Sequence, residues 1–189
     1  MVQETYRVLP GPEAYLAPAA AMMGVMPPDS GSAIVEGSVV SEDEAIAVIA
    51  RKLADAKNPA VCPGPLLIWQ WDDGVSAKAA AVRELAEACG AKILPMIDYS
   101  ARRIRTDMEI SPNHPNVTIL QNDIDVCLFA GVHSHYANYA LRLIRARTDC
   151  YTIVLGDYSA SEDAMASLRD INVDKINAIT EKIKSLKRG

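Results

Sequence analysis

An unbroken apolar run, Val126 to Ala130, constrains the fold of this chain more than any other feature. The run has the length of a strand, and a continuous apolar strand is typical of a parallel sheet that is buried on both faces. Gly131 ends the run, a short polar turn follows, and helical spacing of apolar residues extends from Tyr136 to Arg147. A strand followed by a glycine, a turn and a helix is half of a βαβ unit, so the run predicts an α/β fold.

Strand and helix patterns alternate along the rest of the chain. Ser41 and Glu44 form a capping box, which is expected to begin a helix that ends at Asn58-Pro59. Further strands are predicted at residues 65–71, 92–96, 117–120 and 151–156, and further helices at residues 76–89 and 174–186. This alternation predicts a parallel sheet with helices on both faces and right-handed connections.

The first 40 residues differ from the rest in composition. They hold five prolines and four glycines, which do not favour regular structure, yet they are too apolar for a solvated tail. We therefore expect an irregular N-terminal arm over residues 1–40 and a single domain over residues 41–189. Two interpretations of the arm remain open: it folds over its own domain, or it docks on another chain through Met22, Met23 and Met26.

Charge, hydropathy and cysteine spacing exclude several classes of protein. A net charge of −5 argues against nucleic acid as a partner, because no basic stripe is present to neutralise phosphates. No apolar run reaches the length of a membrane span, and the start lacks the basic region of a signal peptide, so a cytoplasmic protein is expected. The cysteines stand singly, without metal-ligand spacing, and are expected to be small buried hydrophobes.

Polar residues that follow the predicted strands are the candidates for a binding site. Ligands of open α/β sheets bind at the carboxyl ends of the strands, where Gly131, His133, His135, Asn138 and Asp157 are expected. The two histidines are too close in sequence for a helical metal pair, and no carboxylate accompanies them in the turn. Their imidazoles either bind a cofactor or a partner subunit, or satisfy local backbone groups. Asp157 either accepts a ribose hydroxyl or caps a helix.

Two kinds of functional motif are missing from the sequence. Trp-Asp-Asp-Gly at residues 71–74 stands where a dinucleotide-binding fold would carry GxGxxG, and its two acids would repel phosphate. No Ser/His/Asp or Cys/His set can be assigned, so no catalytic residue is predicted.

Three short stretches can be compared with known families: Ala-Lys-Asn-Pro at residues 56–59, the strand at residues 124–131 and Tyr-Ala-Asn at residues 136–138. Together they resemble the epsilon subunit family of archaeal carbon monoxide dehydrogenase/acetyl-CoA synthase, the acetyl-CoA decarbonylase/synthase complex. Members tend to carry Asn-Ala-x-x-Ser-Phe-x-Asn after the last strand. Residues 163–170 read Asp-Ala-Met-Ala-Ser-Leu-Arg-Asp, with three departures. The resemblance covers residues 41–186 and leaves the arm outside.

The resemblance implies a Rossmann-like domain of the DHS-like NAD/FAD-binding type. It implies an accessory subunit without a cluster or an activity of its own, bound to the large alpha subunit as an α2ε2 unit. That partner carries the nickel–iron–sulfur and iron–sulfur clusters where CO and CO2 interconvert. The resemblance also implies a surface for electron transfer or for docking FAD. A free-standing FAD- or NAD-binding protein of the same fold is the alternative hypothesis.

Overall fold

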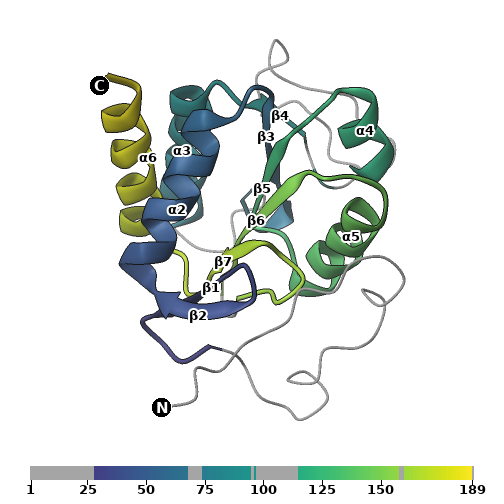
Figure 1. The fold of residues 1–189 in the computed structure, drawn as a ribbon. Helices are drawn as coiled ribbons and strands as arrows, with labels where there is room; N and C mark the ends of the chain where they lie inside the picture. The colour runs from purple at the N-terminus through teal and green to yellow at the C-terminus, as the bar shows by residue number, and fades with distance from the viewer. Residues whose placement is uncertain (1–27, 68–73, 95, 97–114, 158–159, 189) are drawn as a thin grey trace.

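Seven strands form one mixed sheet with helices on both faces in the computed structural model, which describes residues 28–67, 74–94, 96, 115–157 and 160–188 (Figure 1). The strands are β1 (Ser32–Val35), β2 (Ser38–Ser41), β3 (Pro59–Pro63), β4 (Lys92–Ile93), β5 (Val126–Ala130), β6 (Tyr151–Leu155) and β7 (Ala166–Leu168). The helices are α2 (Glu42–Asp55), α3 (Val75–Cys89), α4 (Pro115–Gln121), α5 (Ser134–Arg147) and α6 (Val173–Arg188).

The sheet has the order β2-β1-β7-β6-β5-β3-β4. The pairings from β4 through β7 are parallel, whereas β1 pairs antiparallel with both β2 and β7. The α/β prediction is therefore confirmed, and the prediction of a purely parallel sheet is corrected to a mixed one. Within the α/β class, the Rossmann-like type remains a prediction.

The antiparallel edge is a hairpin in the segment that the sequence predicted to be irregular. Glu36 and Gly37 both have positive φ, 49° and 81°, as a tight two-residue hairpin turn requires. The prediction of irregular structure is thereby corrected for residues 32–40. Residues 1–27 lie outside the described residues, so the arm and its docking remain predictions.

Two strand predictions were wrong. The first parallel strand is β3 at Pro59–Pro63, not residues 65–71, of which Pro65–Leu67 form a short 3-10 helix and residues 68–71 lie outside the described ones. Prolines occupy both ends of β3. Because proline is uncommon in central strands, the sequence pattern did not identify this fully buried strand. Residues 117–120 belong to helix α4.

Strand β4 is limited to Lys92–Ile93 of the predicted residues 92–96, and β7 was not predicted. The remaining helices and strands agree with the sequence patterns. Ser41 caps α2 by accepting a hydrogen bond from the Glu44 backbone N–H at 3.3 Å, and Gly90 ends α3 in the left-handed conformation. Strands β5 and β6 and helices α5 and α6 lie within two residues of their predicted bounds. No helix in the described ranges is long and apolar enough to cross a membrane.

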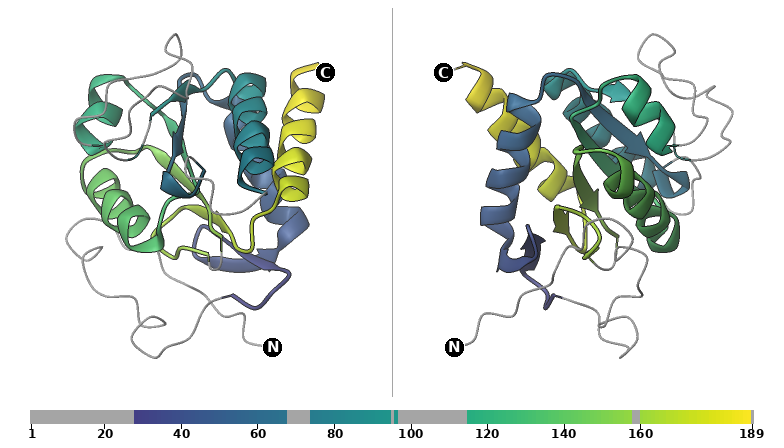
Figure 2. Two further views of the ribbon diagram at one scale, coloured as in Figure 1. Left: turned by 180° about the vertical axis from the view of Figure 1, so that it is seen from behind. Right: turned by 45° about the vertical axis from the view of Figure 1, so that its right-hand side comes forward.

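The sheet separates two helical layers, each with its own core. Helices α2, α3 and α6 cover one face, and α4 and α5 cover the other (Figures 1 and 2). Side chains of β5 alternate between the cores: Val126, Leu128 and Ala130 face the first layer, and Cys127 and Phe129 face the second. This explains the unbroken apolar run, since both faces of the strand are buried.

Residues of the Ala-Lys-Asn-Pro stretch connect the amino ends of β3 and β5. The Asp125 carboxylate accepts hydrogen bonds from the backbone N–H groups of Lys57 at 2.8 Å and Asn58 at 3.0 Å. The Asn58 side-chain amide donates to the carbonyl oxygens of Asn122 and Asp123. The stretch therefore sets the register at the opposite end of the strands from the candidate site.

Candidate functional site

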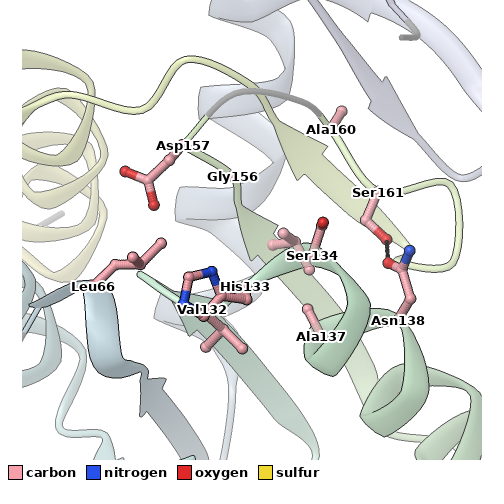
Figure 3. A pocket seen from close by; sticks show the side chains of 11 residues that line it. Leu66, Val132, His133, Ser134, Ala137, Asn138, Gly156, Asp157, Ala160 and Ser161 are labelled. Atoms are coloured by element: carbon pink, nitrogen blue, oxygen red, sulfur yellow. Dashed lines mark hydrogen bonds between the residues drawn. The ribbon is translucent and has the colours of Figure 1, made fainter. Parts of the chain in front are cut away.

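A cavity of about 460 Å³ opens at the carboxyl ends of β5 and β6, within the size range of ligand sites (Figure 3). The chain goes from β3 to β4 on one side and from β5 to β6 and β7 on the other, so the cavity lies beside the point where the strand order reverses. Its walls are Leu66, Val132, His133, Ser134, Ala137, Asn138, Val154, Gly156, Asp157, Ala160 and Ser161.

Two glycines shape the loops beneath the cavity. Gly131 has a φ of +64°, and a Cβ at this position would overlap the side chain of Leu67. A Cβ on Gly64 would overlap the carbonyl oxygen of Gly131, because the ends of β3 and β5 touch there. The Leu66 backbone N–H donates to that same carbonyl at 3.0 Å. Gly131 therefore has a structural role behind the cavity wall and does not line the cavity.

Helix α5 begins at the cavity, and His133 is its N-cap residue. The His133 side chain makes no capping hydrogen bond, so its imidazole is not used to satisfy the helix start. The partial positive charge of the first turn faces the cavity, as in sites that bind anionic groups. His135 is exposed and outside the cavity lining, with its ring stacked on that of His133 at 5.8 Å between centroids.

Asp157 follows β6 and has one satisfied and one unsatisfied oxygen. Its Oδ1 forms an ion pair with Lys78 Nζ on α3 at 2.5 Å. Its Oδ2 is buried and has no hydrogen-bond partner in the described part of the chain. A buried acceptor without a donor is costly, so Oδ2 is a ready acceptor for a hydroxyl or amine group in the cavity.

Asn138 and Ser161 close the opposite wall. The Ser161 hydroxyl donates to Asn138 Oδ1 at 2.8 Å, and the Ser161 backbone N–H donates to Ser167 Oγ at 2.7 Å. The first bond connects α5 to the loop between β6 and β7, and the second connects this loop to β7. The wall is therefore polar and held on both sides.

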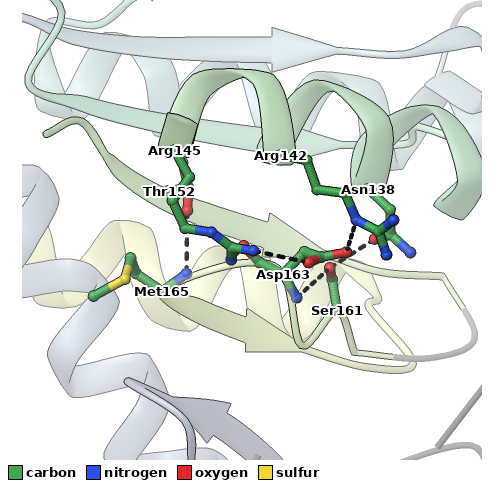
Figure 4. A network of polar contacts seen from close by, with 7 residues as sticks. All are labelled: Asn138, Arg142, Arg145, Thr152, Ser161, Asp163 and Met165. Atoms are coloured by element: carbon green, nitrogen blue, oxygen red, sulfur yellow. Dashed lines mark hydrogen bonds and ion pairs between the residues drawn. The ribbon is translucent and has the colours of Figure 1, made fainter. Parts of the chain in front are cut away.

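Asp163, at the first position of the stretch that departs from the family pattern, anchors the same loop to α5 (Figure 4). Its carboxylate accepts from Arg142 Nε at 3.0 Å and from Arg145 Nη2 at 3.1 Å, and Arg145 Nη1 donates to its backbone carbonyl at 2.8 Å. The Asp163 side chain is 8% exposed, so these are buried charge-assisted bonds. Burial and the neighbouring Asp163 raise the pKa of Glu162 above its usual value.

The structure brings three of the five predicted site residues together: His133, Asn138 and Asp157 line one cavity. Gly131 lies behind the wall, and His135 lies outside it. Their role in binding a ligand remains a prediction. The sequence analysis missed Lys78 and Ser161, because neither belongs to a recognisable motif.

All four cysteines, Cys62, Cys89, Cys127 and Cys150, are buried and free, as predicted. Burial raises the pKa values of the Cys62 and Cys89 thiols. A hydrogen bond with Cys150, together with burial, raises that of Cys127. Protonated, enclosed thiols are poor nucleophiles. No cluster of three potential metal ligands occurs among the residues that the structure describes.

These observations define an α/β protein with a mostly parallel sheet and a ligand-sized cavity at its carboxyl edge. Residues 23–183 match the family described as CO dehydrogenase beta subunit/acetyl-CoA synthase epsilon subunit, and the chain belongs to this family. The match begins before residue 41, so the likeness includes the β1–β2 hairpin as well as the domain that the sequence motifs identified. A search of curated proteins finds no match.

Proposed function

We propose that this chain is a non-catalytic accessory subunit of the CO dehydrogenase component of an acetyl-CoA decarbonylase/synthase complex. The observation that carries the proposal is the family match over residues 23–183. In this role the chain binds and stabilises the alpha subunit, which holds the nickel–iron–sulfur cluster, in an α2ε2 unit. The chemistry on CO and CO2 belongs to that partner.

Isolation of the complex from its native cells tests this proposal. The chain should co-purify with a large subunit at equal stoichiometry, and native mass spectrometry should give a mass of two copies of each. Metal analysis should find nickel and iron in that complex. A chain that elutes alone and metal-free from an extract with intact CO dehydrogenase activity would contradict the proposal.

A nucleotide site at the carboxyl edge is the second candidate function, favoured by the unpartnered Oδ2 of Asp157. The cavity residues fit part of such a ligand. Asp157 can accept a hydrogen bond from a ribose hydroxyl, and the start of helix α5 can bind a phosphate. The glycine fingerprint is missing, so the pyrophosphate would lie at α5 and not at the turn after β3. A bound FAD would supply electron transfer to an outside acceptor, while His133, Asn138 and Asp157 would hold and orient it.

Titration of the purified chain with FAD and with NAD tests this second function. Asp157→Asn removes the carboxylate charge and should weaken binding by roughly 10-fold or more, the usual effect of losing a charged hydrogen bond. His133→Ala should also weaken binding. His135→Ala is the matched control, because this ring lies outside the cavity and its loss should leave affinity unchanged. Equal affinities in all variants would place any nucleotide site elsewhere.

A further inference from the structure

Helix α5 has a buried apolar side, and its solvent-exposed side carries a second stripe that contains aromatic residues. Tyr136 is 47% exposed and Tyr139 is 63% exposed. Leu143, which is partly exposed, continues the same helix face at the i, i+3, i+7 spacing. In the described ranges four large apolar or aromatic side chains are strongly exposed, and three of them, Leu120, Tyr136 and Tyr139, belong to the α4–α5 layer.

Charged residues are scarce on the two described helices of this layer. Helix α4 has no charged residue, and α5 has none before Arg142. By contrast, α6 carries both acids and lysines, as a solvated helix does. Tyrosines without neighbouring charges are typical of the core of a protein–protein interface and of its energetic hot spots.

The charge on α5 indicates which kind of surface would bind it. The helix contains three arginines and no acid, and two of the arginines, Arg142 and Arg145, are paired with Asp163. Arg147, at the last turn, is exposed. In a symmetric dimer the same patch meets itself, which would bring the two copies of Arg147 together, so a second copy fits poorly. An apolar depression with an acidic rim fits well.

We propose that the α5 face formed by Tyr136, Tyr139, Leu143 and Arg147 is the docking surface for a protein partner with an apolar depression and an acidic rim. The inference rests on the proposed function, which makes the alpha subunit that partner. The surface is continuous with the cavity: the Tyr136 ring lies 4.5 Å from that of His135, which stacks on His133 of the cavity wall. The docked partner therefore lies next to the carboxyl edge of the sheet.

Binding of the full-length chain to the purified metal-loaded alpha subunit, measured anaerobically, tests the docking surface. Tyr139→Glu places a charge in the centre of the contact and should weaken binding by roughly 30-fold or more, as loss of a hot-spot aromatic does. Leu186→Glu is the matched control: Leu186 is 46% exposed on α6, in the opposite layer, and its replacement should leave affinity unchanged. Equal melting temperatures would establish that both variants fold.

Arg147→Glu provides an independent variant at the edge of the stripe. It should slow association several-fold and reduce its salt dependence, while Lys182→Glu on α6 should not. If the wild-type chain binds the alpha subunit and neither Tyr139→Glu nor Arg147→Glu weakens binding, the docking surface is wrong and the proposed function stands. If the wild-type chain does not bind, both are wrong. A homodimer that Tyr139→Glu abolishes would make a second copy the occupant and overturn the inference.

Discussion

The two helical layers are built from different interactions, although they cover the same sheet. In the α2–α3–α6 layer, helices pack through aliphatic side chains such as Leu53, Leu85 and Ile179, all fully buried. The ion pair between Lys184 and Glu84 lies at the surface of this layer, and the pair between Lys175 and Glu42 is partly buried. In the α4–α5 layer a smaller apolar core is supplemented by buried charges, with Asp163 between two arginines.

Together with the docking surface proposed on α5, this difference would separate stability from recognition. When an apolar stripe holds a helix against the core, the opposite side of the helix is free to carry charged residues. Helices α2 and α6 of the α2–α3–α6 layer carry charged residues on their solvent-exposed sides. Helix α5 is fixed by Asp163 and Ser161 at one flank, which leaves its first turn for the cavity and its outer side for the tyrosines. We therefore expect substitutions in the two layers to have different functional consequences.

Removal of the buried carboxylate should have the largest effect. Asp163→Ala leaves two arginines without their buried counter-charge and should lower the free energy of unfolding by about 3–5 kcal/mol, measured by chemical denaturation. The surface pair of the other layer is the control: Glu84→Ala removes a partner of Lys184 at 2.7 Å but should cost about 0–1 kcal/mol. Similar losses in both variants would contradict the comparison.

Truncation of one leucine in each layer tests the division between stability and recognition directly. Leu53 on α2 and Leu141 on α5 are both fully buried, so Leu53→Ala and Leu141→Ala should each cost about 2–5 kcal/mol. Leu141→Ala should also weaken binding of the alpha subunit, because α5 presents the tyrosines. If Leu53→Ala weakened that binding as much, recognition would not be confined to the α4–α5 layer.

Loss of the α2 cap should have a smaller effect. Ser41→Ala removes the acceptor for the Glu44 N–H and should lower the free energy of unfolding by about 1 kcal/mol. Thermal unfolding measures the loss, and Ser41→Asn, which keeps a capping oxygen, should restore most of it. An unchanged midpoint in Ser41→Ala would show that the capping bond contributes nothing to this layer.

The smallest effect should be a change in pH dependence at Glu162. Burial and Asp163 raise the pKa of this carboxyl in the folded state, so ionisation of Glu162 disfavours folding. Its favourable contribution is complete below the ordinary glutamate pKa and is lost as the pH rises through the raised value. Glu162→Gln stays neutral, so it should be more stable than the wild type at pH 7 and no more stable near pH 4. Denaturation midpoints from pH 4 to 8 measure this, and a difference independent of pH would exclude Glu162 as its source.

Local patterns predicted the parts of the site that follow directly from strand ends. His133, Asn138 and Asp157 were predicted because they follow buried strands, and the carboxyl ends of parallel strands meet at one edge. Lys78 was not predicted, because it lies on a helix 79 residues before Asp157 and meets it only in the folded chain. His135 lies only two residues after His133, and at a helix start no periodicity shows which of the two side chains faces the cavity.

The sequence by itself determined the helices and strands whose signals are local: the capping box of α2, the glycine after α3 and the apolar runs of β5 and β6. Only the tertiary structure decided the β1–β2 edge, the assignment of α4 and the buried charges of Asp163. Periodicity and capping depend on neighbours within a turn of chain. Strand pairing, desolvation and ion pairs depend on residues that are distant in sequence and adjacent only after folding.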